Sequence, residues 1–122
     1  MKWRESISYE RYEQLKVSRA DRIVRILISN PSARNAINAD IHEELSYIFD
    51  DIDRDDECDV AILSGEGDAF CAGGDLQWLR SMANNMPDHV RCARNDRRIQ
   101  NSMLDLEKPL IARVVGPAVG LG

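Results

Sequence analysis

Residues 64–76 read Ser-Gly-Glu-Gly-Asp-Ala-Phe-Cys-Ala-Gly-Gly-Asp-Leu, a run of small and polar residues between two apolar segments. The four residues before it, 60–63, are all apolar, which predicts a buried strand. Asp75 stands where a helix would begin. Glycines at such a junction leave backbone N–H groups uncovered, and these groups can hold an anion or a developing oxyanion. The stretch has no Gly-Lys-Ser/Thr, and Phe70 replaces the last glycine of a GxGxxG motif, so neither common nucleotide loop is predicted.

A second glycine-rich stretch, residues 116–122, reads Gly-Pro-Ala-Val-Gly-Leu-Gly and follows the two apolar runs 109–112 and 114–115. Two such loops at the ends of parallel strands can aim two N–H groups at one carbonyl oxygen. The chain stops inside this second stretch. We therefore expect it to be the front part of a longer protein.

The pattern of the remaining chain predicts an α/β protein. Residues 12–18 and 23–28 predict a β-hairpin around a tight turn at 19–22. Residues 40–53 predict a helix with one apolar stripe, in which Asp40 and Glu43 have the spacing of a capping box. The apolar run 60–63 predicts a strand covered on both faces.

The second half continues with two helices and a strand. One helix is expected from Asp75, with Leu76 and Leu79 on its inner face. A longer one is expected over 87–106, and residues 109–115 predict a final buried strand. The inward residues of the longer helix are expected to be Val90, Ala93, Ile99, Met103 and Leu106. The predicted order is β-β-α-β-α-α-β, with helices between parallel strands.

Composition sets limits on function. The 122 residues carry 16 Lys+Arg against 21 Asp+Glu, a net charge of −5, so clustered positive charge for nucleic-acid binding is not expected. No apolar run approaches the roughly 20 residues of a membrane span. Three widely spaced cysteines predict neither a disulfide framework nor a zinc site of the CxxC type. Together with an N-terminus lacking an apolar signal region, this indicates a reducing, cytoplasmic location.

Other residues that could carry chemistry are better explained without it. The acidic residues 51–55 have the spacing that begins a calcium-binding loop. However, Asp56 stands where such a loop needs glycine, and Ile62 stands where it needs a glutamate ligand, so a solvated helix end is expected. His42 and His89 have no metal-ligand neighbour at the usual spacing, which favours surface or interface roles. Cys71 is expected to be a small buried packing residue. Three arginines on one helix face predict a solvated surface: Arg91, Arg94 and Arg98.

Three segments together resemble one known family. They are NPSARNAI (residues 30–37), AFCAGGDL (69–76) and KPLIARVVGPAVGLG (108–122), in that order. The combination resembles the enoyl-CoA hydratase/isomerase, or crotonase, superfamily. The resemblance implies a crotonase-like α/β fold, a spiral of ββα units, of which residues 1–122 are the N-terminal part.

The resemblance also implies a substrate and a site. The family binds acyl-CoA thioesters and polarises the thioester carbonyl with two backbone N–H groups, which correspond here to Gly74 and Leu121. Leu121 departs from the glycine usual at its position, but a backbone N–H does not depend on the side chain. Arg34 is expected near the coenzyme A nucleotide. The residues expected to line the substrate are Ala72, Gly73, Gly74, Asp75, Leu76, Gly120 and Leu121.

What the resemblance leaves open is the proton transfer. The two glutamates that activate water in hydratases of the family fall beyond Gly122, so the chain alone is expected to be inactive. Asp75 is expected to cap its helix. No metal and no separate cofactor are expected, since coenzyme A belongs to the substrate. Family members form trimers or pairs of trimers. The alternative function is a non-catalytic acyl-CoA-binding or scaffold protein of the same fold.

Overall fold

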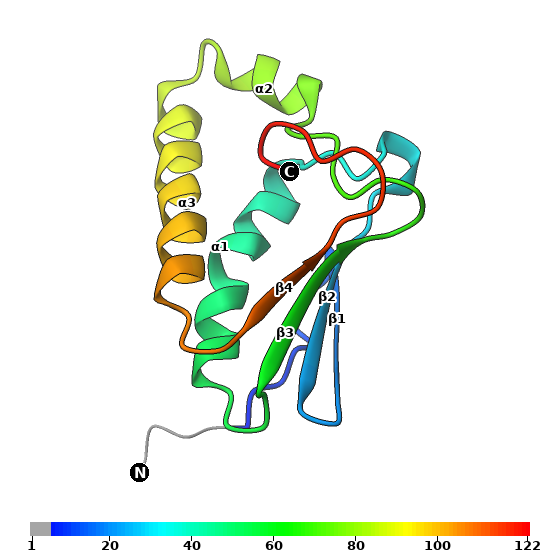
Figure 1. Cartoon of the computed structure of the whole chain (residues 1–122). Coiled ribbons are helices and arrows are strands. Elements are labelled where there is room, and N and C mark those ends of the chain that lie inside the picture. Colours follow the sequence, from blue (N-terminus) through cyan, green and yellow to red (C-terminus); the bar gives the residue numbers. More distant parts are fainter. Residues whose placement is uncertain (1–5) are drawn as a thin grey trace.

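The structure, a computed structural model, describes residues 6–122 and consists of one sheet covered on one side by helices (Figure 1). The four strands are β1 (Leu15–Ala20), β2 (Ile23–Ile28), β3 (Val60–Gly65) and β4 (Leu110–Arg113). They lie side by side in chain order. Helix α1 (Ala39–Arg54) packs between the sheet and helix α3 (Met86–Asp105), and the short helix α2 (Leu76–Met82) lies at one end. The predicted element order is confirmed.

The strand pairing follows from the connections. β1 and β2 are antiparallel and pair from Leu15 with Ile28 to Ala20 with Ile23. The turn between them has both central residues, Asp21 and Arg22, at positive φ, which is the geometry that matches the twist of a hairpin. β2 with β3 and β3 with β4 are parallel. The carboxyl ends of β3 and β4 therefore lie at one edge of the sheet, which brings the two glycine-rich loops together.

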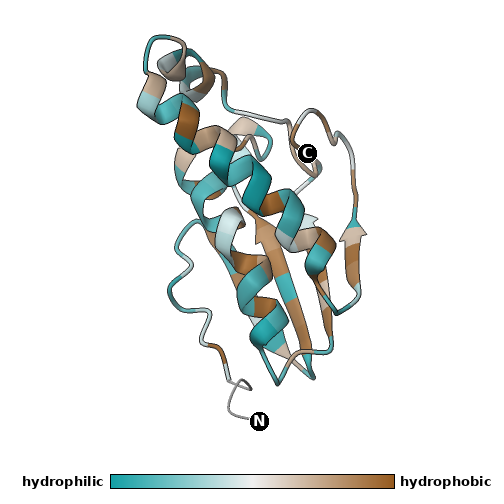
Figure 2. Cartoon of the chain, turned by 90° about the vertical axis from the view of Figure 1, so that its left-hand side faces the viewer, coloured by the Kyte–Doolittle hydropathy of each residue, from teal (hydrophilic) through white to brown (hydrophobic). Residues whose placement is uncertain are grey.

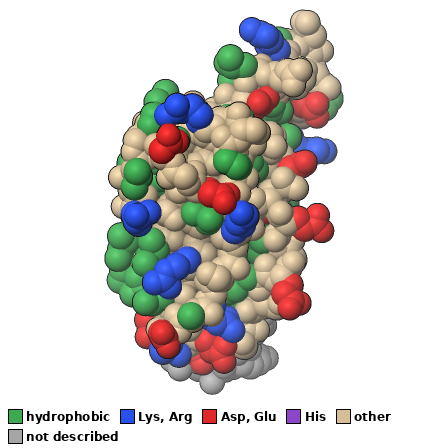
Figure 3. Space-filling model, turned by 90° about the vertical axis from the view of Figure 1, so that its right-hand side faces the viewer, with side chains coloured by type: hydrophobic (Ala, Val, Ile, Leu, Met, Phe, Trp, Pro, Cys, Tyr) green, Lys and Arg blue, Asp and Glu red, His purple; other side chains and the backbone are tan. Residues whose placement is uncertain are grey.

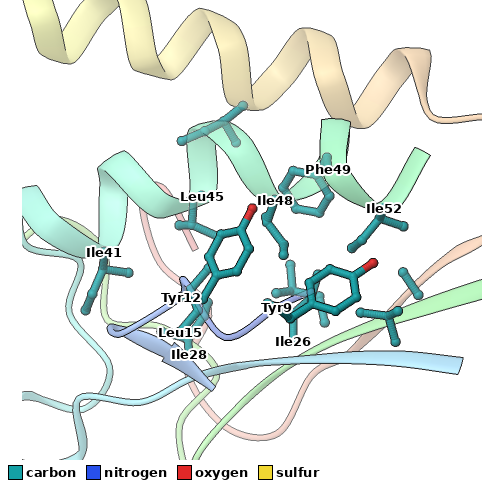
Figure 4. Close-up of a cluster of buried hydrophobic side chains, with 14 of the residues drawn as sticks. Tyr9, Tyr12, Leu15, Ile26, Ile28, Ile41, Leu45, Ile48, Phe49 and Ile52 are labelled. Atoms are coloured by element: carbon teal, nitrogen blue, oxygen red, sulfur yellow. The ribbon is translucent and has the colours of Figure 1, made fainter. Parts of the chain in front are cut away.

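The core lies between α1 and the sheet (Figure 4). The predicted stripe of α1 is confirmed, because Ile41, Leu45, Ile48, Phe49 and Ile52 are all buried. The helix begins one residue earlier than expected, however, and its N-cap is Asn38, whose side chain accepts a hydrogen bond from the Ile41 N–H at 2.9 Å. The capping box at Asp40 was therefore wrong, because Asn38, two residues earlier, is the N-cap and Asp40 lies inside the first turn of the helix.

The outer helices differ from their predicted faces. Ile99 of α3 is buried, but Val90, Met103 and the residue Ala93 are exposed. Leu76 and Leu79 of α2 are exposed as well. Figure 2 shows α3 as largely hydrophilic. Its buried face includes Asn95 and Ser102, polar residues that a hydrophobic pattern cannot detect.

The sheet has one covered face rather than two. In β3 buried residues alternate with partly exposed ones, and β4 has none that is buried. The predictions of a doubly covered strand at 60–63 and of a buried strand at 109–115 were thus wrong. On the side of the molecule away from α3, hydrophobic side chains lie among charged ones (Figure 3). Among residues 6–122, no helix combines the length and the apolar character needed to cross a membrane.

The acidic end of α1 is also less exposed than its sequence indicates. Asp51 is 3% exposed and accepts hydrogen bonds at 2.5 Å from Arg11 and Tyr12. Asp55 is 1% exposed and is bound by Tyr9 and Arg19, both at 2.7 Å. These carboxylates hold the N-terminal segment and β1 to the end of α1, so a solvated helix end describes only part of it.

Candidate active site

Three loops meet at the carboxyl edge of the parallel strands. The first, residues 30–37, runs beside the glycine loop that follows β3. The Ala72 N–H donates to the Arg34 carbonyl at 3.1 Å, and the Ile37 N–H donates to the Gly73 carbonyl at 2.8 Å. The Asp75 N–H returns a bond to the Ile37 carbonyl at 2.8 Å. These bonds form a short parallel bridge that fixes the backbone on both sides of Gly74.

The last loop, residues 114–122, crosses the same glycine loop. The N–H groups of Phe70 and Cys71 both donate to the Pro117 carbonyl at 3.0 Å, and the Val119 N–H donates to the Cys71 carbonyl at 3.0 Å. The two backbones come so close at Gly73 that a Cβ atom there would lie 2.9 Å from the Val119 carbonyl oxygen. Gly73 also has φ +96°, so only glycine suits the position. The loops predicted to lie together do so.

The two predicted donors lie on these crossing loops. Gly74 follows the close contact directly, and Leu121 follows Gly120, whose Cα lies within the same contact. Throughout residues 6–122, no protein atom accepts a hydrogen bond from the N–H of Gly74 or of Leu121. The residue before Leu121, Gly120, has φ +59°, whereas Leu121 does not have a positive φ and carries no left-handed strain.

The remaining predicted site residues surround this crossing. Asp75 caps α2 as expected, accepting a hydrogen bond from the Trp78 N–H at 2.9 Å. Ala72, Leu76 and Arg34 are exposed along the same edge. Arg34 has φ 52° and reaches the site through its backbone carbonyl, which binds Ala72.

Asn35 is a site residue that the sequence analysis missed. It is fully buried, and its side-chain amide donates to the carbonyls of Glu66 and Ala69, both at 2.8 Å. Its Oδ1 accepts from the Asn30 N–H at 2.9 Å. The Asn-Pro sequence at residues 30–31 predicts a turn. It does not predict that the side chain of Asn35 would hydrogen-bond to the loop that follows β3.

The other residues considered for chemistry in the sequence gave mixed outcomes. Cys71 is buried, and burial raises the pKa of its thiol, as suits a packing residue. His42 is 1% exposed rather than on the surface, because α3 covers it and places Asp96 against its ring. His89, Arg91, Arg94 and Arg98 are exposed, as expected for a solvated face.

Comparison with known proteins shows the family to which the chain is related. The family model "Enoyl-CoA hydratase/isomerase" matches residues 18–122. The chain is 33% identical over 114 residues to human enoyl-CoA delta isomerase 2, covering 90% of the chain and 28% of the relative. It is 30% identical over 122 residues to the chromodomain Y-like protein of Rattus norvegicus, covering 98% of the chain and 20% of that protein.

A solved structure gives the same result for the fold. An enoyl-CoA hydratase/isomerase from Mycobacterium paratuberculosis superposes with a TM-score of 0.90 at 30% identity, covering 93% of this chain and 46% of that one. The chain thus spans less than half the length of each of these relatives. With a family model matched over most of its length and a common fold, the chain belongs to the enoyl-CoA hydratase/isomerase family.

Proposed function

We propose that the chain holds the carbonyl-polarising part of an enoyl-CoA hydratase or isomerase. In this proposal the backbone N–H groups of Gly74 and Leu121 bind the thioester oxygen of an acyl-CoA. The observation that carries it is the crossing of the two glycine loops at Gly73. On each loop an N–H group beyond this contact, that of Gly74 or of Leu121, donates no hydrogen bond to any group among residues 6–122.

The chemistry needs such donors because charge moves onto the thioester oxygen. Attack on an enoyl thioester, or loss of an α proton, gives an enolate. Two preorganised N–H groups stabilise it, and loss of one such donor typically costs about 3 kcal/mol in the transition state. Backbone donors held by hydrogen-bonded loops need no ordering during the reaction.

Proton transfer is the part that these residues do not supply. Asp75 accepts the Trp78 N–H, and Glu66 accepts hydrogen bonds from Lys16, at 3.1 Å, and from Ser29. Both carboxylates already have structural partners. We therefore expect the 122-residue chain to bind acyl-CoA without converting it.

A measurement of binding and turnover tests this proposal. Acetyl-CoA should raise the thermal midpoint of the chain, while free acetate should not, and crotonyl-CoA should not be hydrated. Hydration of crotonyl-CoA by the chain itself would contradict the expected inactivity. Absence of any acetyl-CoA binding would contradict the site.

The second candidate is a non-catalytic acyl-CoA-binding or scaffold protein. It is kept beside the first because the relatives of the chain include a chromodomain Y-like protein as well as enoyl-CoA enzymes. Both candidates predict acyl-CoA binding. They differ in whether any longer protein that contains residues 1–122 turns over crotonyl-CoA or an isomerisable enoyl-CoA. We further propose a reducing compartment such as the cytoplasm, and a homotrimer or pair of trimers as the assembled form.

A further inference from the structure

A polar pocket lies between α1 and α3, beside α2. None of the residues that line it belongs to the three loops of the candidate active site. Its volume is about 540 Å³. The side chains that matter to the argument come from all three helices: His42 from α1, Trp78 from α2, and Cys92 and Asn95 from α3. The proposed acyl-CoA site uses none of them.

Three side chains with different ligand atoms converge here. His42 Nε2 lies 2.6 Å from one oxygen of Asp96, and Cys92 Sγ lies 3.9 Å from the other. The three ligand atoms are all within 4.8 Å of one another. Cys92 and Asp96 are four residues apart on α3 and therefore share a helix face, while His42 reaches them from the facing helix.

These distances are close to those around a bound transition metal ion. Bonds of about 2.0–2.3 Å in a tetrahedral arrangement separate the ligand atoms by roughly 3.3–3.8 Å. The Cys92–Asp96 separation of 3.9 Å lies just above this range. The shorter His42–Asp96 separation is that of a hydrogen bond, and it needs to widen by about 1 Å for a cation to replace the shared proton.

We propose that His42, Cys92 and Asp96 bind a divalent transition metal ion, with zinc preferred. One imidazole, one thiolate and one carboxylate form a donor set that suits zinc, whereas magnesium and calcium require oxygen ligands. His42 and Cys92 both line the pocket, and a water molecule there would supply the fourth ligand of a tetrahedral site. Binding releases the Cys92 thiol proton to solvent, and His42 coordinates in its neutral form through Nε2.

The surroundings of the three residues suit a site that fills from solvent. The His42 side chain is 2% exposed and the Asp96 side chain is 42% exposed. The histidine ligand is therefore buried, while the carboxylate ligand is open to solvent. Burial and the neighbouring Asp96 carboxylate raise the pKa of the Cys92 thiol. A dication between the two groups reverses this effect, because its charge favours the thiolate.

A metal ion at this position would cross-link α1 and α3 and would also restrict the movement of α2. The His42 ring packs against Trp78 of α2, with the ring centroids 4.9 Å apart. Helix α2 starts directly after Gly74 and its cap Asp75. Fixing the His42 ring therefore fixes the surface against which α2 rests.

The experiment uses the full 122-residue chain, reduced, with Co²⁺ as a spectroscopic substitute for Zn²⁺. We expect a single equivalent of Co²⁺ to give the sulfur-to-cobalt charge-transfer absorption of a thiolate ligand, and Zn²⁺ to displace it. Cys92→Ser should abolish the absorption. Asp96→Asn, a change at a half-exposed side chain that leaves packing intact, should weaken binding by at least about 10-fold.

His89→Asn is the matched control, because His89 lies on the same helix but is exposed, and it should leave binding unchanged. Absence of the absorption in the wild-type chain overturns the proposal in favour of a metal-free histidine–carboxylate pair. Persistence of the absorption in Cys92→Ser, or unchanged affinity in Asp96→Asn, overturns it too. No acyl-CoA is involved, so the result is independent of the proposed function.

Discussion

Asn35 connects two of the three loops through hydrogen bonds from its buried side-chain amide. Replacing it with alanine leaves the Glu66 and Ala69 carbonyls without their side-chain donor. Buried groups left unsatisfied cost about 1–3 kcal/mol each. We expect Asn35→Ala to lower the free energy of unfolding by roughly 2–4 kcal/mol, measured by urea denaturation.

Asn35→Gly is the control for this substitution, because Asn35 has φ 61° and glycine adopts that conformation without strain. The glycine variant should lose nearly as much stability as the alanine variant, since both lose the amide. Recovery of wild-type stability in Asn35→Gly would show that backbone strain, and not the hydrogen bonds, determines the effect.

Gly73 and Gly74 are adjacent but should respond differently to alanine. A Cβ at Gly73 meets the Val119 carbonyl oxygen at 2.9 Å, and the residue has φ +96°. A Cβ at Gly74 meets only the end of the flexible Leu79 side chain, at 3.2 Å. We expect Gly73→Ala to cost about 1–3 kcal/mol in stability and to abolish acetyl-CoA protection, while Gly74→Ala keeps the stability largely intact.

Both variants retain every backbone N–H, so the comparison isolates the close approach of the loops. Chemical denaturation and the acetyl-CoA thermal shift measure the two effects. Equal stability of the two variants would mean that the close approach of the loops at Gly73 does not hold the site together.

At the scale of elements, Asp55 links the end of α1 to β1. Burial alone would raise the pKa of this carboxyl, but hydrogen bonds from Tyr9, the Glu57 N–H and Arg19 outweigh it and lower the pKa below the ordinary 3.8. The unfolded chain therefore binds the proton more readily. The stability from Asp55 is present above about pH 4 and is lost as the pH falls through the folded-state pKa.

Asp55→Asn should thus cost about 3 kcal/mol at neutral pH, because it leaves Arg19 without its buried partner, and should flatten the fall in stability toward about pH 3. Urea midpoints across this range measure both effects. Asp50→Asn, an exposed carboxylate of the same helix, serves as the control and should change neither. An unchanged slope in Asp55→Asn would show that another group dominates the acid sensitivity.

The sequence predicted the positions of helices and strands better than it predicted which face of each helix is buried. The stripe of α1 and the hairpin were found because their apolar spacing is regular and local. The inner face of α3 was misassigned because it buries Asn95 and Ser102 and leaves Val90 in solvent. The cap of α1 was misplaced because Asn38 and Asp40 are both good capping residues, and only the structure shows which one accepts the hydrogen bond.

The candidate site was predictable to the extent that its residues belong to local motifs. The two glycine loops follow parallel strands, so their meeting at one edge could be inferred. Asn35, bound to carbonyls more than 30 residues away, and the His42–Asp96 contact, which spans 54 residues, are products of tertiary packing. Spacing along a sequence carries no information on such pairs.

For the whole molecule, the central claim is that one thioester oxygen receives two hydrogen bonds from separate loops. Two of the exposed apolar residues of the last loop are Leu121, one of the proposed donors, and Val119, two residues before it. The chain spans 46% of the solved relative, so the site is best tested by binding rather than by turnover. Backbone amides can be observed directly by nuclear magnetic resonance of the ¹⁵N-labelled chain.

The most direct measurement is a titration of that labelled chain with acetyl-CoA, following the amide protons of Gly74 and Leu121. Hydrogen bonding to one oxygen predicts that both resonances move downfield and saturate at the same ligand concentration. Binding of acetyl-CoA with neither resonance shifted, or with only one of them shifted, would contradict the account.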